Sequence, residues 1–139
     1  MNARLDALLD WYATLSPATL ARLPQWYAAD AHFKDPFNDV TGLAVISRIF
    51  GHMFETTEHP RFVILERMAQ GTQGFATWRF EFGLNGRQYT VLGASHLRFD
   101  DSGRVCEHRD YWDAAEELWQ KLPVIGAPVR WLRGRFRAG

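Results

Sequence analysis

The residues best suited to chemistry lie on the last strand that the sequence predicts, at about residues 104–113. Successive side chains of a strand point to opposite faces of a sheet, so His108, Asp110 and Trp112 share one face. A carboxylate among aromatic rings is poorly solvated, and it must find hydrogen-bonding partners or change its protonation state. Either outcome makes Asp110 a candidate for acid–base chemistry.

The two preceding strands complete that face. They are predicted at about 75–84 and 87–99, and they are joined by Asn85-Gly86, a dipeptide that tolerates the positive φ of a tight hairpin turn. Alternation gives the first of these strands an aromatic row that helices must cover. We expect seven side chains of the strands to line a pocket beside Asp110: Trp78, Phe80, Tyr89, Val91, Ser95, His108 and Trp112.

Three helices are predicted in the N-terminal half. Apolar residues from Leu5 to Leu15 recur at the spacing of one helix face, and this places Tyr12 on the inward side. Ser16-Pro17 is typical of a helix start, and the short helix that begins there is limited by Pro24. A third helix follows Gly42 and ends before residue 60.

Between the second and third helices the sequence predicts a short strand at 31–34. The residues that follow it, from Asp35 to Asp39, have turn chemistry, and Pro36 biases Asp35 toward an extended backbone. A further strand is expected at about 61–68, before the meander of the three strands already described.

Helices that precede a run of antiparallel strands indicate the α+β class. We predict an antiparallel sheet packed against three N-terminal helices and enclosing a pocket. The 139 residues suit one domain over 1–139, with a core at about 5–119 and a basic tail at 120–139.

Composition excludes several classes of function. Sixteen basic side chains balance sixteen acidic ones, so no nucleic-acid partner is expected. No apolar run is long enough to span a membrane, and no secretion signal is recognised, so we expect a cytoplasmic location. Cys106 is the single cysteine and the five histidines lack paired ligand spacing, so we expect no metal, and no cofactor either.

Three stretches of the sequence resemble the nuclear transport factor 2-like superfamily, and its SnoaL-like branch most of all. They are YAADAHFKDP at 27–36, LRFDDSGRV at 97–105 and HRDYWD at 108–113. The resemblance follows the order of elements from about Leu5 to Trp119. It implies a cone of curved sheet closed by helices, often paired as a dimer through the sheet.

The stretch that ends in Asp35-Pro36 is similar to the one that supplies the catalytic base of ketosteroid isomerases, and Asp35 is the matching position. Tyr12 falls, with one residue deleted from the intervening loop, where those enzymes place the phenol that donates to the oxyanion. Their third group is a protonated acid, and here Ser95 takes its place. A hydroxyl donates less strongly to an oxyanion.

The last strand resembles that of limonene epoxide hydrolases, in which the residue matching Asp110 activates water. The Arg and Asp that complete that site are replaced here by Trp78 and Phe80, and Asp35 takes the place of a water-holding amide. SnoaL-like polyketide cyclases also resemble this chain in having an acid–base aspartate near the last strand.

These resemblances lead to one hypothesis. Asp35 and Asp110 form a carboxylate pair across one pocket, one acting as acid and the other as base, with Tyr12, Ser95 and His108 as hydrogen-bonding partners. The reaction would be an isomerisation, a cyclisation or a hydrolysis of a small hydrophobic molecule. The alternative function is a non-catalytic ligand-binding or dimerisation module of the same fold, and a homodimer is expected in either case.

Simpler structural roles compete with each catalytic assignment. Asp35 can serve only to start its turn, and Asp110 can form a partly buried ion pair with Arg79 or Arg109. Tyr12 can be a core residue, and His108 can be a satisfied buried histidine that lines the pocket. The tail is either a solvated end or a weakly amphipathic helix at a dimer or membrane surface. Its basic and apolar residues are Arg130, Arg133, Arg135, Arg137, Val129, Leu132 and Phe136.

Overall fold

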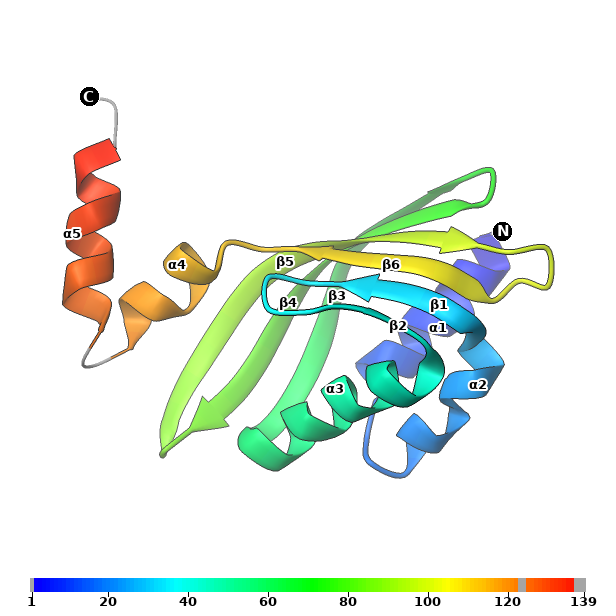
Figure 1. The fold of residues 1–139 in the computed structure, drawn as a ribbon, viewed down its shortest axis with the longest axis horizontal. Coiled ribbons are helices and arrows are strands. Elements are labelled where there is room, and N and C mark those ends of the chain that lie inside the picture. Colours follow the sequence, from blue (N-terminus) through cyan, green and yellow to red (C-terminus); the bar gives the residue numbers. More distant parts are fainter. Residues whose placement is uncertain (1, 123–124, 137–139) are drawn as a thin grey trace.

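A computed structural model describes residues 2–122 and 125–136. It contains a six-stranded curved sheet with the strand order β2-β1-β6-β5-β4-β3. The N-terminal helices α1, α2 and α3 lie together on one side of the sheet (Figure 1), which confirms the predicted α+β class. The sheet is open, because β2 and β3 form its two edges.

Helix α1 spans Asn2–Ala13 and has the inward face that its apolar spacing predicts. Leu5, Leu8 and Leu9 on this face are fully buried, and Tyr12 beside them is buried too. Burial of such large apolar side chains is the main favourable term that holds the helix on the sheet.

The second predicted helix is divided into two short pieces. A 3-10 turn, η1, spans Thr19–Arg22, and α2 spans Leu23–Trp26 with Pro24 in its first turn. Proline lacks the N–H that a continuous helix requires, so the first piece ends and a new one begins. The predicted start at Ser16-Pro17 was therefore early. The Ser16 hydroxyl accepts instead from the backbone N–H of Thr19, where η1 begins.

Strand β1, Tyr27–Lys34, follows α2 at once and is four residues longer than predicted. It pairs antiparallel with the short strand β2, Asp39–Thr41, across the turn at Asp35. On its other side β1 runs parallel to β6. The predicted sheet was antiparallel throughout. The difference arises because the meander β3 to β6 returns beside β1 in the direction that β1 itself takes.

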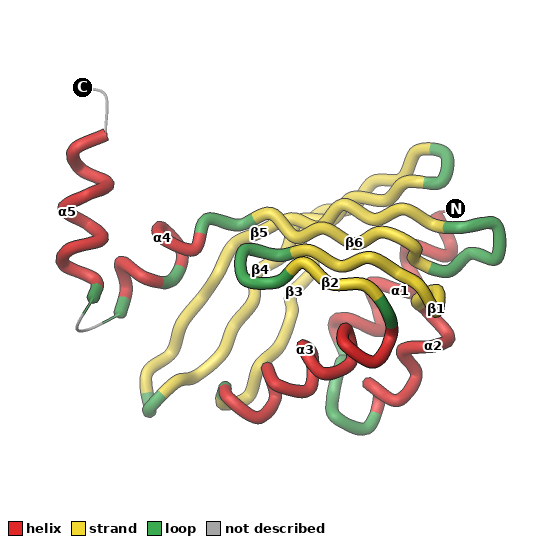
Figure 2. Tube along the Cα trace, in the orientation of Figure 1, coloured by secondary structure: helices red, strands yellow, loops and turns green. Residues whose placement is uncertain are grey.

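Helix α3, Leu43–Thr56, begins after Gly42, which has φ 109°, and it buries Ile46 and Phe50. Figure 2 shows α3 beside the curved ends of the long strands, with α1 and α2 grouped near the other end of the sheet. Helix α3 therefore lies over a part of the sheet that α1 does not cover.

The last four strands form the predicted meander. They are β3 (Glu58–Gln70), β4 (Gln73–Leu84), β5 (Arg87–Phe99) and β6 (Val105–Tyr111). Asn85 and Gly86 both have positive φ, at 52° and 79°, as the hairpin prediction requires. Strand β3 begins three residues earlier than predicted and passes through Pro60. An edge strand tolerates this residue because it needs fewer backbone donors.

The chain after β6 leaves the body of the protein. Asp113 caps α4, Ala114–Glu117, by accepting from the N–H groups of Ala115 and Glu116. A 3-10 turn, η2 (Trp119–Lys121), leads to α5 (Gly126–Phe136), which stands away from the sheet in Figure 1. The predicted apolar positions Val129 and Phe136 and the charges of Arg133 and Arg137 lie outside the described side chains.

No helix in the described part of the chain is both long enough and apolar enough to cross a membrane.

Candidate functional site

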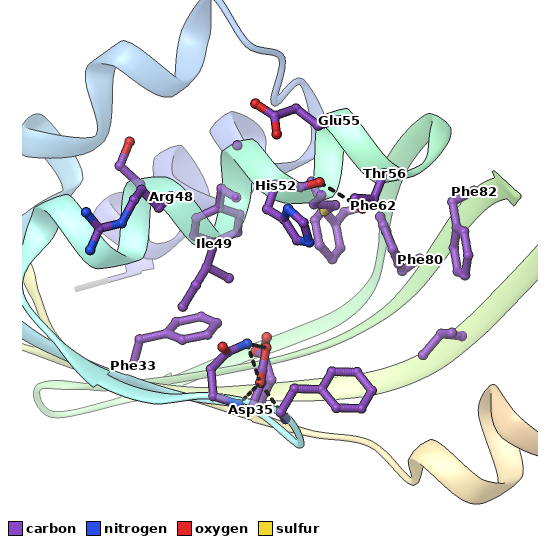
Figure 3. Close-up of a pocket in the computed structure, with 18 of the residues that line it drawn as sticks. Phe33, Asp35, Arg48, Ile49, His52, Glu55, Thr56, Phe62, Phe80 and Phe82 are labelled. Carbon is purple, nitrogen blue, oxygen red and sulfur yellow. Dashed lines mark hydrogen bonds between the residues drawn. The ribbon is translucent and has the colours of Figure 1, made fainter.

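A cavity of about 950 Å³ lies between α3 and the concave face of the sheet. Figure 3 shows Ile49 and His52 extending from α3 into this space, with Phe80 on the sheet side and Asp35 opposite the helix. Aromatic rings make up much of its wall. They belong to Phe33, Phe37, Phe50, Phe62, Trp78, Phe80, Phe82 and Trp112.

Asp110 lies on β6 and lines this cavity. Its side chain is 15% exposed, and its Oδ1 accepts two hydrogen bonds, from Ser95 Oγ at 2.5 Å and from His108 Nε2 at 2.6 Å. Oδ2 accepts no hydrogen bond from the described residues. Asp110 is therefore anchored through one oxygen, and the other has no partner among the described residues.

The wall behind Asp110 is set by the register of three strands. Ser95 on β5 is paired with Asp110 on one side and with Ala76 on the other. Trp78 donates from Nε1 to Ser95 Oγ at 2.9 Å. An indole N–H can only donate, so Ser95 accepts there and its own proton goes to Asp110.

Gly93 allows this arrangement of Trp78. The two residues are paired across β4 and β5, and the indole ring lies directly over the glycine. A Cβ added at position 93 would be 2.4 Å from the Trp78 ring. The sequence therefore positions the indole by leaving out a side chain on the neighbouring strand.

His108 is 3% exposed and connects Asp110 to two phenols in the core. Its Nδ1 is 3.0 Å from the Tyr12 hydroxyl and 2.5 Å from the Tyr27 hydroxyl. Burial, and then the negative charge of Asp110, raise the pKa of Tyr27 well above its ordinary value of 10. The phenol of Tyr27 is thus neutral, and the network runs from the core to Asp110 at the cavity.

Asp35 occupies the turn between β1 and β2. Its Oδ1 accepts from the backbone N–H groups of Phe37 and Asn38, at 2.8 and 2.7 Å, and the Asn38 amide donates to both carboxylate oxygens. The simple turn role is therefore present. Asp35 also lines the same cavity as Asp110, so the two roles coexist in one side chain.

The predicted site residues divide into two groups. Six line the cavity: Asp35, Asp110, Trp78, Phe80, Val91 and Trp112. The other four are buried in the wall behind it: Tyr12, Ser95, His108 and Tyr89. Tyr12 directs its hydroxyl at His108 and does not line the cavity. The alternative ion pairs of Asp110 are not formed, since Arg79 pairs with Glu81 and Arg109 lies over the Tyr111 ring.

Sequence reasoning missed Tyr27 and the polar side chains of α3 at the rim of the cavity. Tyr27 stands four residues before the predicted strand, and its inward direction follows only once β1 is known to begin there. Arg48 and His52 are one helical turn apart, and that spacing would have placed them on one side of α3. Nothing in the sequence placed that side over the cavity.

Known proteins of similar sequence pattern and structure share this architecture. The family model of the SnoaL-like domain matches residues 8–108. No curated protein matches the chain. An NTF2-like protein of unknown function from Burkholderia pseudomallei is similar in structure, with a TM-score of 0.73 at 18% identity over 84% of this chain and 95% of that one.

Two further similar structures are of proteins named for an activity. A putative SnoaL-like polyketide cyclase from a Jannaschia species has a TM-score of 0.73 at 15% identity, over 90% of this chain and 92% of that one. An LEH-like epoxide hydrolase from M. tuberculosis has a TM-score of 0.67 at 15% identity, over 83% of this chain and 84% of that one. At these identities the likeness concerns the fold, and the family model covers most of the chain. The chain belongs to the SnoaL-like domain family.

Proposed function

We propose that the protein binds a small, ring-containing apolar molecule in the cavity and acts on it by acid–base catalysis, with Asp110 as the base. The size and aromatic wall of the cavity support the binding step, because such pockets suit ligands of a few rings. The family includes cyclases, isomerases and epoxide hydrolases, and all of these move a proton at a small molecule.

One observation carries the catalytic part of the proposal. Asp110 lines the cavity, its Oδ1 is held by Ser95 and His108, and its Oδ2 accepts no hydrogen bond from the described residues. A base that is fixed in this way needs little reorganisation when it takes a proton from a ligand, and a positioned base contributes about 100-fold to 10,000-fold to a rate. Asp35, on the same cavity, is the second carboxylate of the proposed pair.

The experiment is a turnover screen. The protein is incubated with a library of cyclic ketones, epoxides and polyketide-like phenols, and consumption is followed by mass spectrometry. We expect Asp110→Asn to abolish turnover and Asp35→Asn to lower it, while both variants retain binding. Asp101→Asn is the matched control, because Asp101 is an exposed turn residue outside the cavity. Unchanged turnover in Asp110→Asn would refute Asp110 as the base.

The alternative is a ligand-binding module without catalysis. The observation that favours it is the place of Tyr12, since the expected oxyanion donor is committed to His108 in the core. Under this alternative, compounds bind in the cavity and return unchanged from the screen.

We propose further that two copies of the chain pair through the outer face of the sheet. Large apolar side chains lie exposed there, on the opposite face from Trp78 and Asp110 by strand register. They are Met68, Phe75, Leu92 and Tyr111. Exposed apolar area of this kind marks interaction surfaces.

Size-exclusion chromatography with light scattering tests the pairing, because it measures the molar mass of the protein in solution. We expect twice the mass of the 16.0 kDa chain, and half of that value for Leu92→Glu. A monomer at micromolar concentration would contradict the pairing. We place this dimer in the cytoplasm, because Cys106 is a free thiol and a reducing compartment suits it.

A further inference from the structure

The charge of the cavity depends on the protonation state of His108, and its hydrogen bonds determine that state. Two buried phenols, Tyr12 and Tyr27, reach Nδ1, and neither hydroxyl has another partner among the described residues. Nδ1 has one lone pair, so as an acceptor it takes one of the two phenol protons, whereas a protonated Nδ1 would leave both phenol protons without an acceptor in the core. We therefore assign Nδ1 as the acceptor and Nε2 as the protonated nitrogen, which donates to Asp110.

His108 in this form is neutral, so it does not compensate the charge of Asp110. The other donor to Asp110 is the uncharged Ser95 hydroxyl. Asp35 is held by two backbone N–H groups and the Asn38 amide, which are uncharged as well. Hydrogen bonds from neutral donors stabilise a carboxylate, but they leave its full negative charge in place.

No described Lys or Arg forms an ion pair with either carboxylate. Arg48 and His52 lie at the exposed rim on α3, where water screens charge. Lys34 and Arg109 line a second cleft, which Asp35 and Asp110 also border, but neither cation is within ion-pair distance of the two carboxylates. The cavity thus combines two carboxylates that form no ion pair with a described Lys or Arg and a wall of aromatic faces.

From this combination we infer that the preferred ligand is an organic cation, a molecule with an apolar body and a protonated or quaternary nitrogen. A cation gains from the carboxylates and from aromatic faces such as those of Trp78, Phe80 and Trp112. A weakly hydrated organic ammonium gives up less water than a metal ion would. This inference rests on the proposed use of the cavity as a ligand site, and it narrows the class of substrate.

The test is a comparison of two molecules of the same shape. Phenyltrimethylammonium carries a fixed positive charge, and tert-butylbenzene is its neutral isostere. Binding is measured by ligand-observed NMR and by quenching of tryptophan fluorescence at low ionic strength. An uncharged apolar cavity would favour tert-butylbenzene, because removing an ammonium from water costs free energy. We expect the cation to bind about tenfold more tightly.

The carboxylates are tested by Asp110→Asn and Asp35→Asn. Both changes keep hydrogen-bonding atoms at the same places, so each variant should fold, as its amide spectrum will show. Each should lower the affinity for the cation by about three- to tenfold and leave tert-butylbenzene within twofold. Asp101→Asn should change neither.

The outcomes separate the two proposals. Equal or tighter binding of tert-butylbenzene overturns the cation inference and leaves the cavity as an apolar ligand site. Cation selectivity that survives in both variants also overturns it, because the carboxylates would not be its source. Binding of neither molecule overturns the inference and the proposed ligand site together.

Discussion

Gly93 and Trp78 show how a single residue determines the geometry of the site. The indole occupies the volume that a side chain at position 93 would need, and from there it donates to Ser95. The sequence placed Trp78 and Ser95 on the correct faces by alternation. It could not have revealed their contact with each other, since that depends on a missing Cβ on the neighbouring strand.

Gly93→Ala should displace the Trp78 ring and break its hydrogen bond to Ser95. The expected cost is about 1–3 kcal/mol in the free energy of unfolding, as for other overpacked cores. Urea denaturation measures this cost. Gly51→Ala in α3 is the control, because its Cβ would meet only Leu20 Cδ2, at 4.0 Å. Equal stabilities of the two variants would contradict the packing argument.

The contribution of the Tyr27 hydroxyl to stability can also be tested with a single substitution. Tyr27→Phe removes a fully buried donor to His108, and we expect a loss of about 1–2 kcal/mol in unfolding free energy. Tyr89→Phe is the matched control, since no hydrogen bond of the Tyr89 hydroxyl is described. A loss in the control as large as that in Tyr27→Phe would show that the bond to His108 is not the cause.

At the scale of elements, His32 joins three strands. It lies on β1 and contacts Asp39 on β2 through Nε2, and Glu107 on β6 through Nδ1. The hydrogen bond with Asp39, followed by the one with Glu107, raises the pKa of His32 above its ordinary value of 6.5. Periodicity could not predict this connection, because it depends on the parallel pairing of β1 with β6.

The stability that His32 contributes should depend on pH in a defined direction. A raised pKa in the folded state means that the contribution is complete below about pH 6.5 and is lost as pH rises through the raised pKa. Thermal unfolding of the wild type and of His32→Gln at a series of pH values should therefore show a difference that shrinks toward alkaline pH. Added salt should reduce it, because the side chain is 35% exposed.

His96 supplies a control of opposite sign. Burial, and then the charge of Arg98, lower the pKa of His96 below its ordinary value of 6.5. Protonation of His96 therefore destabilises the folded state as pH falls below that ordinary value. The difference between the wild type and His96→Gln should accordingly favour the variant at acid pH. The same pH trend in both variants would show that the contacts of His32 are not responsible.

At the scale of the whole molecule, the order of the elements and the identity of the concave face were predictable. Two kinds of periodicity, helical and then strand-like, define them. The parallel pairing in the sheet, the two-part second helix and the network through His108 were not. Each of these depends on contacts between segments that are far apart in the chain.

The C-terminal helix gives a prediction at this scale. Helix α5 packs on η2 and leaves Trp131 and Leu132 exposed, so it contributes little to the core. Truncation after Leu122 should lower the melting temperature by no more than about 2 °C, which corresponds to less than 1 kcal/mol for a domain of this size. Calorimetry measures this change, and a larger drop would show that α5 stabilises the body.

The two Asp110 oxygens differ in their hydrogen bonds, and this difference has a stereochemical consequence. Oδ1 is occupied by Ser95 and His108, so Oδ2 is the oxygen left to take a proton, and Asp110 borders the cavity from β6. A carbon that loses a proton to this oxygen loses it from one face, and a proton returned by the same oxygen arrives on that same face. Turnover in deuterated water would then label a single prochiral position, and any new centre would form as one enantiomer.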